Sequence, residues 1–334
     1  MVMIKWMAVT LLALMMLTGC ALAEQVMERA LPQDVSAKAV TLFAGSDHEL
    51  SGELLAPADA EPNTPYVVFA HGSGPSDMDE TIGGCKPLRD LAYDLAALGV
   101  GSLRYDKITY VHPYLPYETV DQEYLLPVGE ALRVLREETE AARAYLIGHS
   151  EGGMLTPYLV DACGFDGGVA LAGTPLQLWE ISYAQNLALL SLLPPEYSAQ
   201  LPLVEAERER ALRLAGMSEE EARAEAPVFG MPALYLWHMA QMDQARIAEE
   251  SGKPFLFLWG DRDFQVDRAA FDVWQARLGD GPRYAYRIYE GLNHLFMPAG
   301  ENDSILSAME AYNEPKHMDT RVAADIAAWI ADQK

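Results

Sequence analysis

The sequence is poor in basic side chains and in cysteine. It holds 24 lysines and arginines against 49 aspartates and glutamates, giving a formal net charge of -25, and three of its 334 residues are cysteine. An acidic surface repels phosphate, which excludes nucleic acid as a partner and a basic membrane-binding surface. So few cysteines exclude a disulfide scaffold. The histidines form no zinc motif such as H-E-x-x-H, so we expect neither a metal nor another cofactor.

The chain also lacks a hydrophobic run long enough to span a bilayer. The apolar stretch at residues 6–17 (WMAVTLLALMML) is only twelve residues long and follows a cation, as is typical of an export signal. We interpret residues 1–23 as this signal and expect an exported protein. Two processing sites overlap. The small residues at 21–23 suit ordinary cleavage, whereas residues 17–20 (LTGC) resemble a lipoprotein signal in which Cys20 would carry a lipid anchor, the one expected contact with a membrane.

Two further cysteines, Cys85 and Cys163, leave one possible disulfide open. An oxidising compartment would permit the bond. Isolated cysteines are more often small buried residues, and the spacing does not choose between the two interpretations.

Strand and helix patterns alternate along most of the chain. Residues 38–43 and 49–55 alternate with a period of two and predict an antiparallel hairpin. Short β-rich runs follow at 66–70, 101–105, 144–147, 168–172, 255–259 and 285–289. Helical periodicity occurs at 87–98, 121–138, 151–163, 266–278 and 319–332. A hairpin followed by repeated strand–helix units predicts an α/β fold, with a mostly parallel eight-stranded sheet flanked by helices.

Residues 175–252 interrupt the alternation. They contain helix-like pieces separated by prolines and no convincing strand. Because a structureless loop of this length is improbable, we expect an inserted helical cap over the carboxyl edge of the sheet. The main domain then consists of residues 24–174 and 253–334. The charged run at 205–225 is most simply a solvated helical face.

A G-x-S-x-G motif, Gly148-His149-Ser150-Glu151-Gly152, lies between a predicted strand and a predicted helix. This context is the one that a nucleophile elbow requires, because glycines permit the tight turn that lifts the serine above the sheet edge. We therefore predict Ser150 to be a nucleophile. A serine hydroxyl needs a base and a group that orients the base.

The base is predicted to be His294, which follows the last predicted strand. Its competitors are less well placed, because His71 and His149 belong to turns that frame the site and His317 lies at the edge of the last helix. Functional groups gather on loops at the carboxyl ends of parallel strands, and His294 lies on such a loop.

Two aspartates, Asp261 and Asp263, follow the strand at 255–259 and compete for the role of the acid. We prefer Asp263, because the spacing G-x-x-D places its carboxylate deeper in the loop. Asp261 is better suited to forming the turn.

The glycine-rich turn at residues 71–75 (HGSGP) supplies backbone N–H groups for an oxyanion hole. In a nucleophile elbow the second donor is the residue after the serine. We therefore predict the N–H groups of Ser73 and Glu151 to hold the developing oxyanion.

Several segments resemble, in order and spacing, a group of bacterial α/β-hydrolases that contains short-chain carboxylesterases. They are HGSGPSDMDETIGGCKPLRDLA, LRYDK, GHSEGGML, ALAGT, LWGDRDFQV and YEGLNHLF. The resemblance extends from about Val40 to the C-terminus and is weakest in the cap. It implies an α/β-hydrolase fold, a serine esterase activity and a small ester of a short-chain acid as substrate.

The chain departs from this group at three places. Ile108 stands where the group commonly has arginine, Cys85 where it often has asparagine, and Glu151 where it often has leucine. The missing arginine removes any family-based expectation about substrate charge. An anionic Glu151 side chain beside the nucleophile would oppose an anionic intermediate, so we expect it to point away or to be paired.

The predicted cap segments 179–193 and 231–241 carry large apolar side chains that suit either an acyl pocket or the core of the cap. Among single residues, Tyr235, Trp237 and Leu295 are predicted to contact the substrate. Two other functions stay open: a peptidase of the same fold, with carboxylates of residues 205–225 holding a peptide amino terminus, and an exported binding protein without turnover. The complete triad disfavours the latter. The sequence gives no indication of the oligomeric state.

Overall fold

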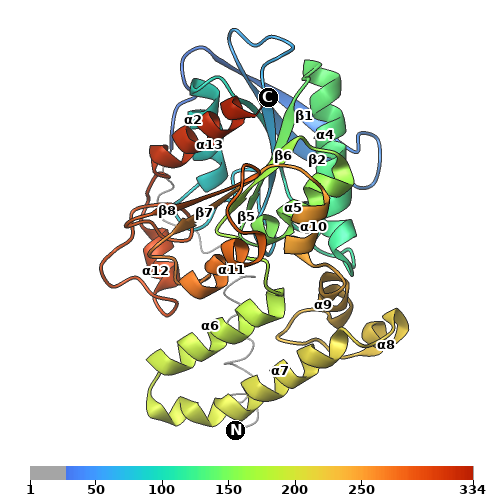
Figure 1. Cartoon of the computed structure of the whole chain (residues 1–334), viewed down its shortest axis with the longest axis vertical. Helices are drawn as coiled ribbons and strands as arrows, with labels where there is room; N and C mark the ends of the chain where they lie inside the picture. The colour runs from blue at the N-terminus through green and yellow to red at the C-terminus, as the bar shows by residue number, and fades with distance from the viewer. Residues whose placement is uncertain (1–27, 334) are drawn as a thin grey trace.

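The computed structural model describes residues 28–333 and is built around one eight-stranded sheet (Figure 1). The strand order is β1-β2-β4-β3-β5-β6-β7-β8. β2 runs antiparallel to both neighbours, and every pair from β4 to β8 is parallel. The predicted mostly parallel eight-stranded sheet is therefore confirmed. The strands are β1 (Val35–Leu42), β2 (Leu50–Pro57), β3 (Tyr66–Ala70), β4 (Gly101–Tyr105), β5 (Ala144–His149), β6 (Gly167–Leu171), β7 (Phe255–Gly260) and β8 (Tyr284–Tyr289).

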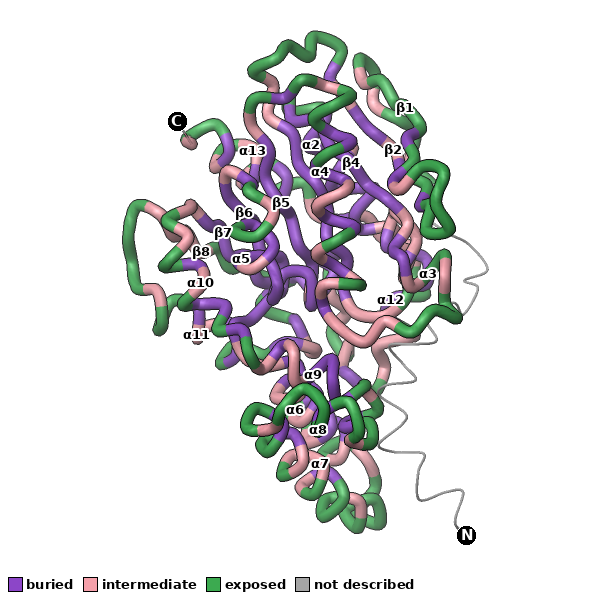
Figure 2. Tube along the Cα trace, turned by 90° about the vertical axis from the view of Figure 1, so that its right-hand side faces the viewer, coloured by how far each residue is buried: buried purple, intermediate pink, exposed green. Residues whose placement is uncertain are grey.

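Helices cover both faces of the sheet. α2 (Pro87–Ala97) and α13 (Thr320–Asp332) lie on one face, and α4 (Leu126–Thr139), α5 (Glu151–Cys163) and α11 (Arg268–Leu278) lie on the other. Alternate residues of β3 show the two layers, because Val67 and Phe69 pack in the cluster with α2 and α13, whereas Val68 packs in the cluster with α4 and α5. Every residue of β3 to β7 is buried (Figure 2), as expected for strands covered on both faces.

The segment after β6 forms a group of helices at one end of the sheet (Figure 1). It consists of α6 (Leu178–Leu192), the 3₁₀ helix η3 (Pro195–Gln200), α7 (Leu201–Leu214), α8 (Glu219–Ala224) and α9 (Ala233–Ala240). The range 175–252 that the sequence assigns to the cap also includes α10 (Gln244–Glu250). This helix packs against α5 and buries Ala245 and Ala248 in the sheet-side core, so it belongs with the main domain.

The predicted helix at 121–138 is not α-helical throughout. It begins with a π-helical turn, η2 (Asp121–Leu125), and continues as α4. Pro127 has no N–H to donate to the turn before it, which favours a wider turn at that point. η2 carries Glu123 and Tyr124, both of which take part in the site described below. The remaining short helices are α3 (Ile108–Val111) and α12 (Ala308–Asn313).

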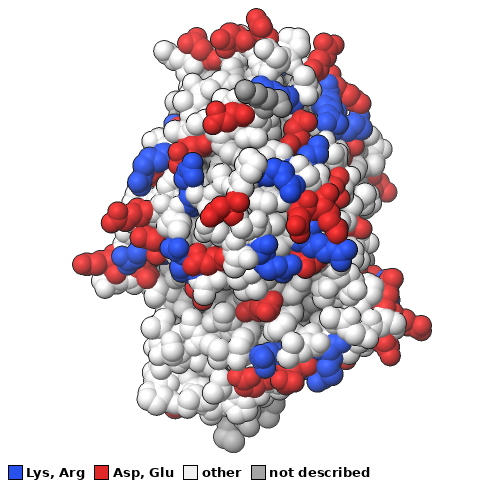
Figure 3. Space-filling view, viewed as in Figure 1, with Lys and Arg blue, Asp and Glu red and all other residues white. Residues whose placement is uncertain are grey.

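The face of the molecule in Figure 3 carries basic and acidic side chains side by side over the sheet domain, whereas the face over α6 is almost free of charge. The charged run at 205–225 falls on α7 and α8, where Arg210 pairs with Glu207 and Glu225, and Arg223 pairs with Glu219. Within residues 28–333 no helix is both long and apolar enough to cross a bilayer. Cys85 and Cys163 are free thiols, so the disulfide that the sequence left open is not formed. The expected signal at 1–23, including Cys20, lies outside the described residues.

Candidate active site

Ser150 occupies a sharp turn between β5 and α5. Its backbone angles, φ 51° and ψ -112°, are strained for a residue with a Cβ. The flanking glycines are required by close packing. A Cβ on Gly148 would lie 2.1 Å from the carbonyl oxygen of Gly152, and a Cβ on Gly152 would lie 2.4 Å from that of Ala70. The motif therefore allows strand, turn and helix to approach closely enough to hold Ser150 at the end of the sheet.

Asp263 and His294 are brought together on the loops that follow β7 and β8. Both are buried, and His294 Nδ1 lies 2.7 Å from Asp263 Oδ2. The other carboxylate oxygen, Oδ1, accepts the N–H groups of Gln265 and Val266 at 2.8 and 2.9 Å. These bonds fix the carboxylate against the ring. Because Nδ1 is engaged, Nε2 is the nitrogen of His294 left to exchange a proton with a nucleophile.

The competing residues lie elsewhere. Asp261 is exposed and accepts the N–H of Gly291 at 2.7 Å, as expected for a residue that forms the turn. His317 Nδ1 lies 2.9 Å from Asp90 Oδ2, away from the triad. His71 is buried beneath the turn, and burial lowers its pKa to about 4, so its ring is neutral at neutral pH.

A buried ion pair connects the separate parts of this site. Glu80 Oε2 lies 2.9 Å from His149 Nδ1, and Glu80 Oε1 accepts the N–H of Gly72 at 2.6 Å. His149 Nε2–H in turn donates to the carbonyl oxygen of His294 at 3.0 Å. Burial acts to lower the pKa of His149, but the charge of Glu80 outweighs it and raises that pKa. Glu80 thus joins the glycine-rich turn, the nucleophile elbow and the histidine loop.

The glycine-rich turn lies against Ser150, because a Cβ on Gly72 would lie 3.3 Å from the Cβ of Ser150. The N–H of Gly72 is bonded to Glu80 and cannot serve an oxyanion. Glu151 is the first residue of α5, where an N–H has no acceptor within its own helix. Ser73 follows Gly72 directly. The predicted donors Ser73 and Glu151 are therefore the residues directly after Gly72 and after Ser150, and both line the same cavity.

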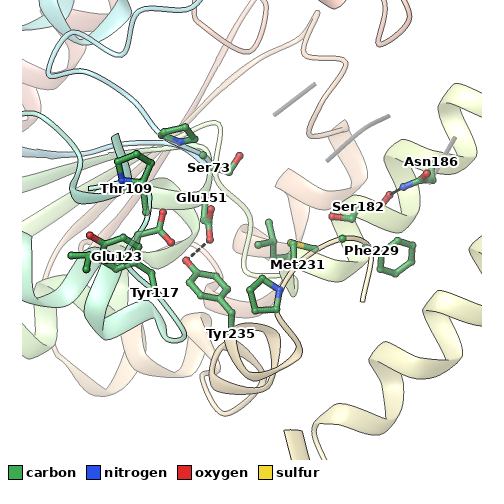
Figure 4. A pocket seen from close by; sticks show the side chains of 17 residues that line it. Ser73, Thr109, Tyr117, Glu123, Glu151, Ser182, Asn186, Phe229, Met231 and Tyr235 are labelled. Atoms are coloured by element: carbon green, nitrogen blue, oxygen red, sulfur yellow. Dashed lines mark hydrogen bonds between the residues drawn. The ribbon is translucent and has the colours of Figure 1, made fainter. Parts of the chain in front are cut away.

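A cavity of about 440 Å³ begins beside this turn and extends under the cap (Figure 4). Ser73 and Glu151 line its inner end, and α6, α9 and the turn at 229–232 supply its walls. The lining is mostly apolar and includes Leu178, Phe229 and Met231. Because the cavity adjoins Ser73 and Glu151, the residues directly after Gly72 and Ser150 that are predicted to hold the oxyanion, it is the candidate binding site for a substrate.

One of the three predicted substrate-contacting residues lines this cavity. Tyr235, on α9, lies at its inner end (Figure 4). Trp237 does not line it, because its ring is turned into the cap and its Nε1–H donates to the carbonyl oxygen of Met217 at 2.9 Å. Leu295 is also absent from the lining, because it is fully buried in a cluster with Cys85, Met297 and Tyr312. Trp237 and Leu295 therefore do not line this cavity.

Glu151 is buried and turns toward the cavity, where its Oε1 accepts the hydroxyl of Tyr235 at 2.8 Å (Figure 4). The side chain does not point away from the cavity, but it is paired, which is one of the two expected arrangements. Its partner is a phenol hydroxyl and not a cation. Burial, together with the charge of Glu123, raises the pKa of Glu151 to about 7. At neutral pH a large fraction of the carboxyl is therefore uncharged.

Lys107 lies behind the cavity and is fully buried. Its Nζ donates to the carbonyl oxygen of Gly72 at 2.8 Å and to the hydroxyl of Tyr124 at 2.7 Å, and it lies 2.7 Å from Glu123 Oε1. These contacts use all three N–H groups of the ammonium. Through its bond to the carbonyl oxygen of Gly72, Lys107 helps to fix the position of the glycine-rich turn.

Sequence reasoning missed Glu80, Lys107 and Glu123 as members of the site. The first two belong to the quoted segments HGSGPSDMDETIG and LRYDK, so their place in the motifs was a signal for their position. Glu123 gave no such signal, because it reaches the site through a π-helical turn that periodicity does not indicate. No group of three metal-ligating side chains occurs between residues 28 and 333.

A mostly parallel sheet, a nucleophile elbow and a carboxylate–histidine pair on the loops after two neighbouring strands define the class of α/β-hydrolases. The chain belongs to the alpha/beta hydrolase family, whose model matches residues 67–304.

Among characterised relatives, the chain is similar to Esterase EstD of Thermotoga maritima. The two are 34% identical over 282 residues, which are 84% of this chain and 65% of that protein. The chain therefore spans less than two thirds of the length of this relative.

Solved structures with the same fold include the esterase Pf2001 of Pyrococcus furiosus, at a TM-score of 0.54 and 15% identity over 93% of this chain and 97% of that one. Another is Est1E of Butyrivibrio proteoclasticus, at a TM-score of 0.52 and 15% identity over 83% and 96%. The acylaminoacyl peptidase of Pyrococcus horikoshii matches at a TM-score of 0.55 and 16% identity, over 90% of this chain and 42% of that one. At these identities the likeness is one of fold.

Proposed function

We propose that the chain is a serine carboxylesterase that hydrolyses short-chain acyl esters through an acyl-enzyme. The observation that carries the proposal is the strained elbow of Ser150 together with the buried Asp263–His294 pair, to which the preceding residue His149 is hydrogen-bonded through the carbonyl oxygen of His294. A relative at 34% identity that is named an esterase supports the ester bond as the target.

The reaction follows from the geometry. Ser150 Oγ attacks the ester carbonyl and its proton passes to His294 Nε2, since Nδ1 is held by Asp263. The negative charge of Asp263 stabilises the imidazolium that forms. The N–H groups of Ser73 and Glu151 stabilise the oxyanion, and His294 returns the proton to the leaving alcohol.

Hydrolysis of the acyl-enzyme repeats these steps with water as the nucleophile. His294 takes a proton from the water, the water oxygen attacks the acyl carbon, and the bond to Ser150 Oγ breaks with return of the proton to the serine. No cofactor is needed for either half of the cycle. The preference for a short acyl chain rests on the resemblance of the sequence to short-chain carboxylesterases.

A peptidase is the alternative function. In that hypothesis the carboxylates of residues 205–225 would hold a peptide amino terminus. None of the residues in this range lines the cavity, and several of its carboxylates are paired with arginines on α7 and α8. The esterase proposal therefore has the stronger support.

The export signal at residues 1–23 supports the further proposal that the enzyme acts outside the cytoplasm, either free or held by a lipid on Cys20. Radiolabelled palmitate incorporated into the wild type but not into Cys20→Ala would identify the lipid anchor. Cleavage after Ala23 without lipid would identify the ordinary signal.

Two measurements test the function. A fluorophosphonate probe is expected to label the wild type and not Ser150→Ala. The p-nitrophenyl butyrate ester is expected to be hydrolysed faster than the decanoate, and both faster than aminoacyl or Xaa-Pro nitroanilides. Faster turnover of a nitroanilide would replace the esterase with a peptidase, and absence of both labelling and turnover would leave a binding protein.

A further inference from the structure

The inner end of the cavity carries acidic groups and no basic one. Glu123 and Glu151 are the only charged side chains among its lining residues. In Figure 4 the carboxylate of Glu151 lies below Ser73, and that of Glu123 lies on the same side of the cavity. A substrate that occupies this cavity therefore places part of itself beside these two carboxylates.

The charge of Glu123 already has a partner. Its Oε1 lies 2.7 Å from Lys107 Nζ, and the other two donors of that ammonium bond to Gly72 and Tyr124. Lys107 does not line the cavity. Its three N–H groups are thus all engaged and it has no donor left for a second carboxylate, although its charge also favours the ionised form of Glu151.

The charge of Glu151 has no such partner. Its carboxyl group interacts with the hydroxyl of Tyr235, at 2.8 Å, and with that of Tyr124, and no ion pair to it occurs within residues 28–333. A carboxylate that is buried without a cation is costly, and proteins ordinarily pair such a group. This one is 5% exposed and faces a space that a substrate enters.

The remaining lining suits a bulky cation. Tyr117, Phe229 and Tyr235 contribute aromatic rings, and Leu178 and Met231 contribute apolar surface. Aromatic rings attract organic cations, and an apolar wall strengthens the attraction between opposite charges because it excludes water.

We propose that Glu151 forms a subsite for a cationic group, so that the preferred substrates are esters that carry an ammonium group in either their acyl or their alcohol part. The proposal deepens the esterase function and rests on it. In the complex the ammonium supplies the charge that Glu151 lacks in the free enzyme. Glu123 adds a second negative potential, which Lys107 partly offsets.

Two pairs of substrates of matched shape test the subsite. Butyrylcholine is compared with 3,3-dimethylbutyl butyrate, in which a tert-butyl group replaces the trimethylammonium. The ethyl ester of 4-(trimethylammonio)butyrate is compared with that of 5,5-dimethylhexanoate. Each kcat/KM is divided by the rate constant for hydroxide-catalysed hydrolysis of the same ester, which removes the chemical effect of the charge on reactivity.

For at least one pair, the corrected kcat/KM of the wild type is expected to be about tenfold or more higher for the cationic ester than for the neutral one. This is the size of effect that contacts to a buried ionised group ordinarily have. Glu151→Gln keeps the shape and the bond to Tyr235, and it is expected to bring the ratio near one. Glu151→Leu serves the same purpose if the glutamine variant does not fold. Glu137→Gln, which removes an exposed acid of α4, is the matched control and is expected to keep the wild-type ratio.

A binding measurement gives an answer that does not depend on turnover. Choline is expected to protect Ser150 from the fluorophosphonate probe at about tenfold lower concentration than 3,3-dimethylbutan-1-ol in the wild type, and at equal concentration in Glu151→Gln. Absence of a cation preference in both assays, or a preference that persists in Glu151→Gln, overturns the proposal. Failure of the wild type to hydrolyse the neutral esters would instead contradict the esterase function. In that case the protection assay alone would test the subsite.

Discussion

The buried pair of Glu80 and His149 allows a sharp test of how the site is held together. Glu80→Gln removes the charge that faces His149 Nδ1 at 2.9 Å and weakens the bond that accepts Gly72 N–H at 2.6 Å. Removing one partner of a buried ion pair costs about 3 to 5 kcal/mol, because the other charge stays buried without compensation. We therefore expect Glu80→Gln to lower the free energy of unfolding by about 3 kcal/mol or more.

The pair also has a defined pH window. Glu80 has its pKa lowered to about 2, because its interaction with His149 outweighs burial, so its contribution is present above its ordinary value of 4.5 and is lost as the pH falls toward 2. His149 has its pKa raised, so its contribution is full below its ordinary value of 6.5 and is lost as the pH rises through the folded-state pKa. The interaction is therefore strongest between about pH 4.5 and 6.5.

A double-mutant cycle with His149→Asn isolates the interaction. Urea unfolding followed by circular dichroism at pH 6 is expected to give a coupling energy of about 2 kcal/mol, which shrinks at pH 9. Asp261→Asn is the control, because its carboxylate also accepts a backbone N–H, from Gly291, but is exposed; it is expected to cost less than about 1 kcal/mol. Additive effects of the two substitutions at pH 6, or a coupling that grows at pH 9, would refute the reasoning.

Three further predictions concern single side chains. Asp263→Asn is expected to lower kcat/KM for p-nitrophenyl butyrate by about 10³ or more, because the ring of His294 loses its orientation. Asp261→Asn is expected to lower it by less than about tenfold. The opposite ranking would assign the role of the acid to Asp261. Burial and Glu123 raise the pKa of Glu151 to about 7, so its contribution to stability is full below pH 4.5 and is lost as the pH rises to about 7. The free energy of unfolding, measured with urea, should therefore fall by about 3 kcal/mol over this range in the wild type, and this fall should be absent in Glu151→Gln. Gly148→Ala is expected to yield no soluble folded protein, since its Cβ would lie 2.1 Å from a carbonyl oxygen, whereas Gly281→Ala, with open space around it, should leave the Tm within a few degrees of the wild type; a folded Gly148→Ala would show that the turn can relax.

The order of strands and helices was predictable because each strand is a short apolar run and each flanking helix has one apolar face. The hairpin, the central strands and helices α2, α5 and α13 all lie within a few residues of their predicted positions. Local sequence carries this information, since burial on both faces of a sheet requires unbroken apolar strands. The start of α4 was not predictable in the same way, because the π-helical turn before Pro127 depends on how the chain packs.

The candidate catalytic residues could be predicted because their positions relative to strands are visible in the sequence. Ser150 follows β5, Asp263 follows β7 and His294 follows β8, and parallel strands bring such ends together. The lining of the cavity was harder, because neighbouring residues of one helix face different ways. Tyr235 and Trp237 are two positions apart on α9, so one reaches Glu151 while the other bonds to Met217 within the cap.

The charge of the whole chain and the charge of the cavity are separate features. Most of the acidic excess behind the net charge of -25 lies on the surface, where salt screens it over about 8 Å at physiological ionic strength. Glu151 lies in a buried, mostly apolar space, where screening is weak and the charge of its ionised form acts strongly on a group beside it. Composition therefore could not have revealed the cavity's preference. The informative feature was one acidic residue directly after the nucleophile, at a position where an anionic side chain works against the oxyanion unless a proton or a cation neutralises it.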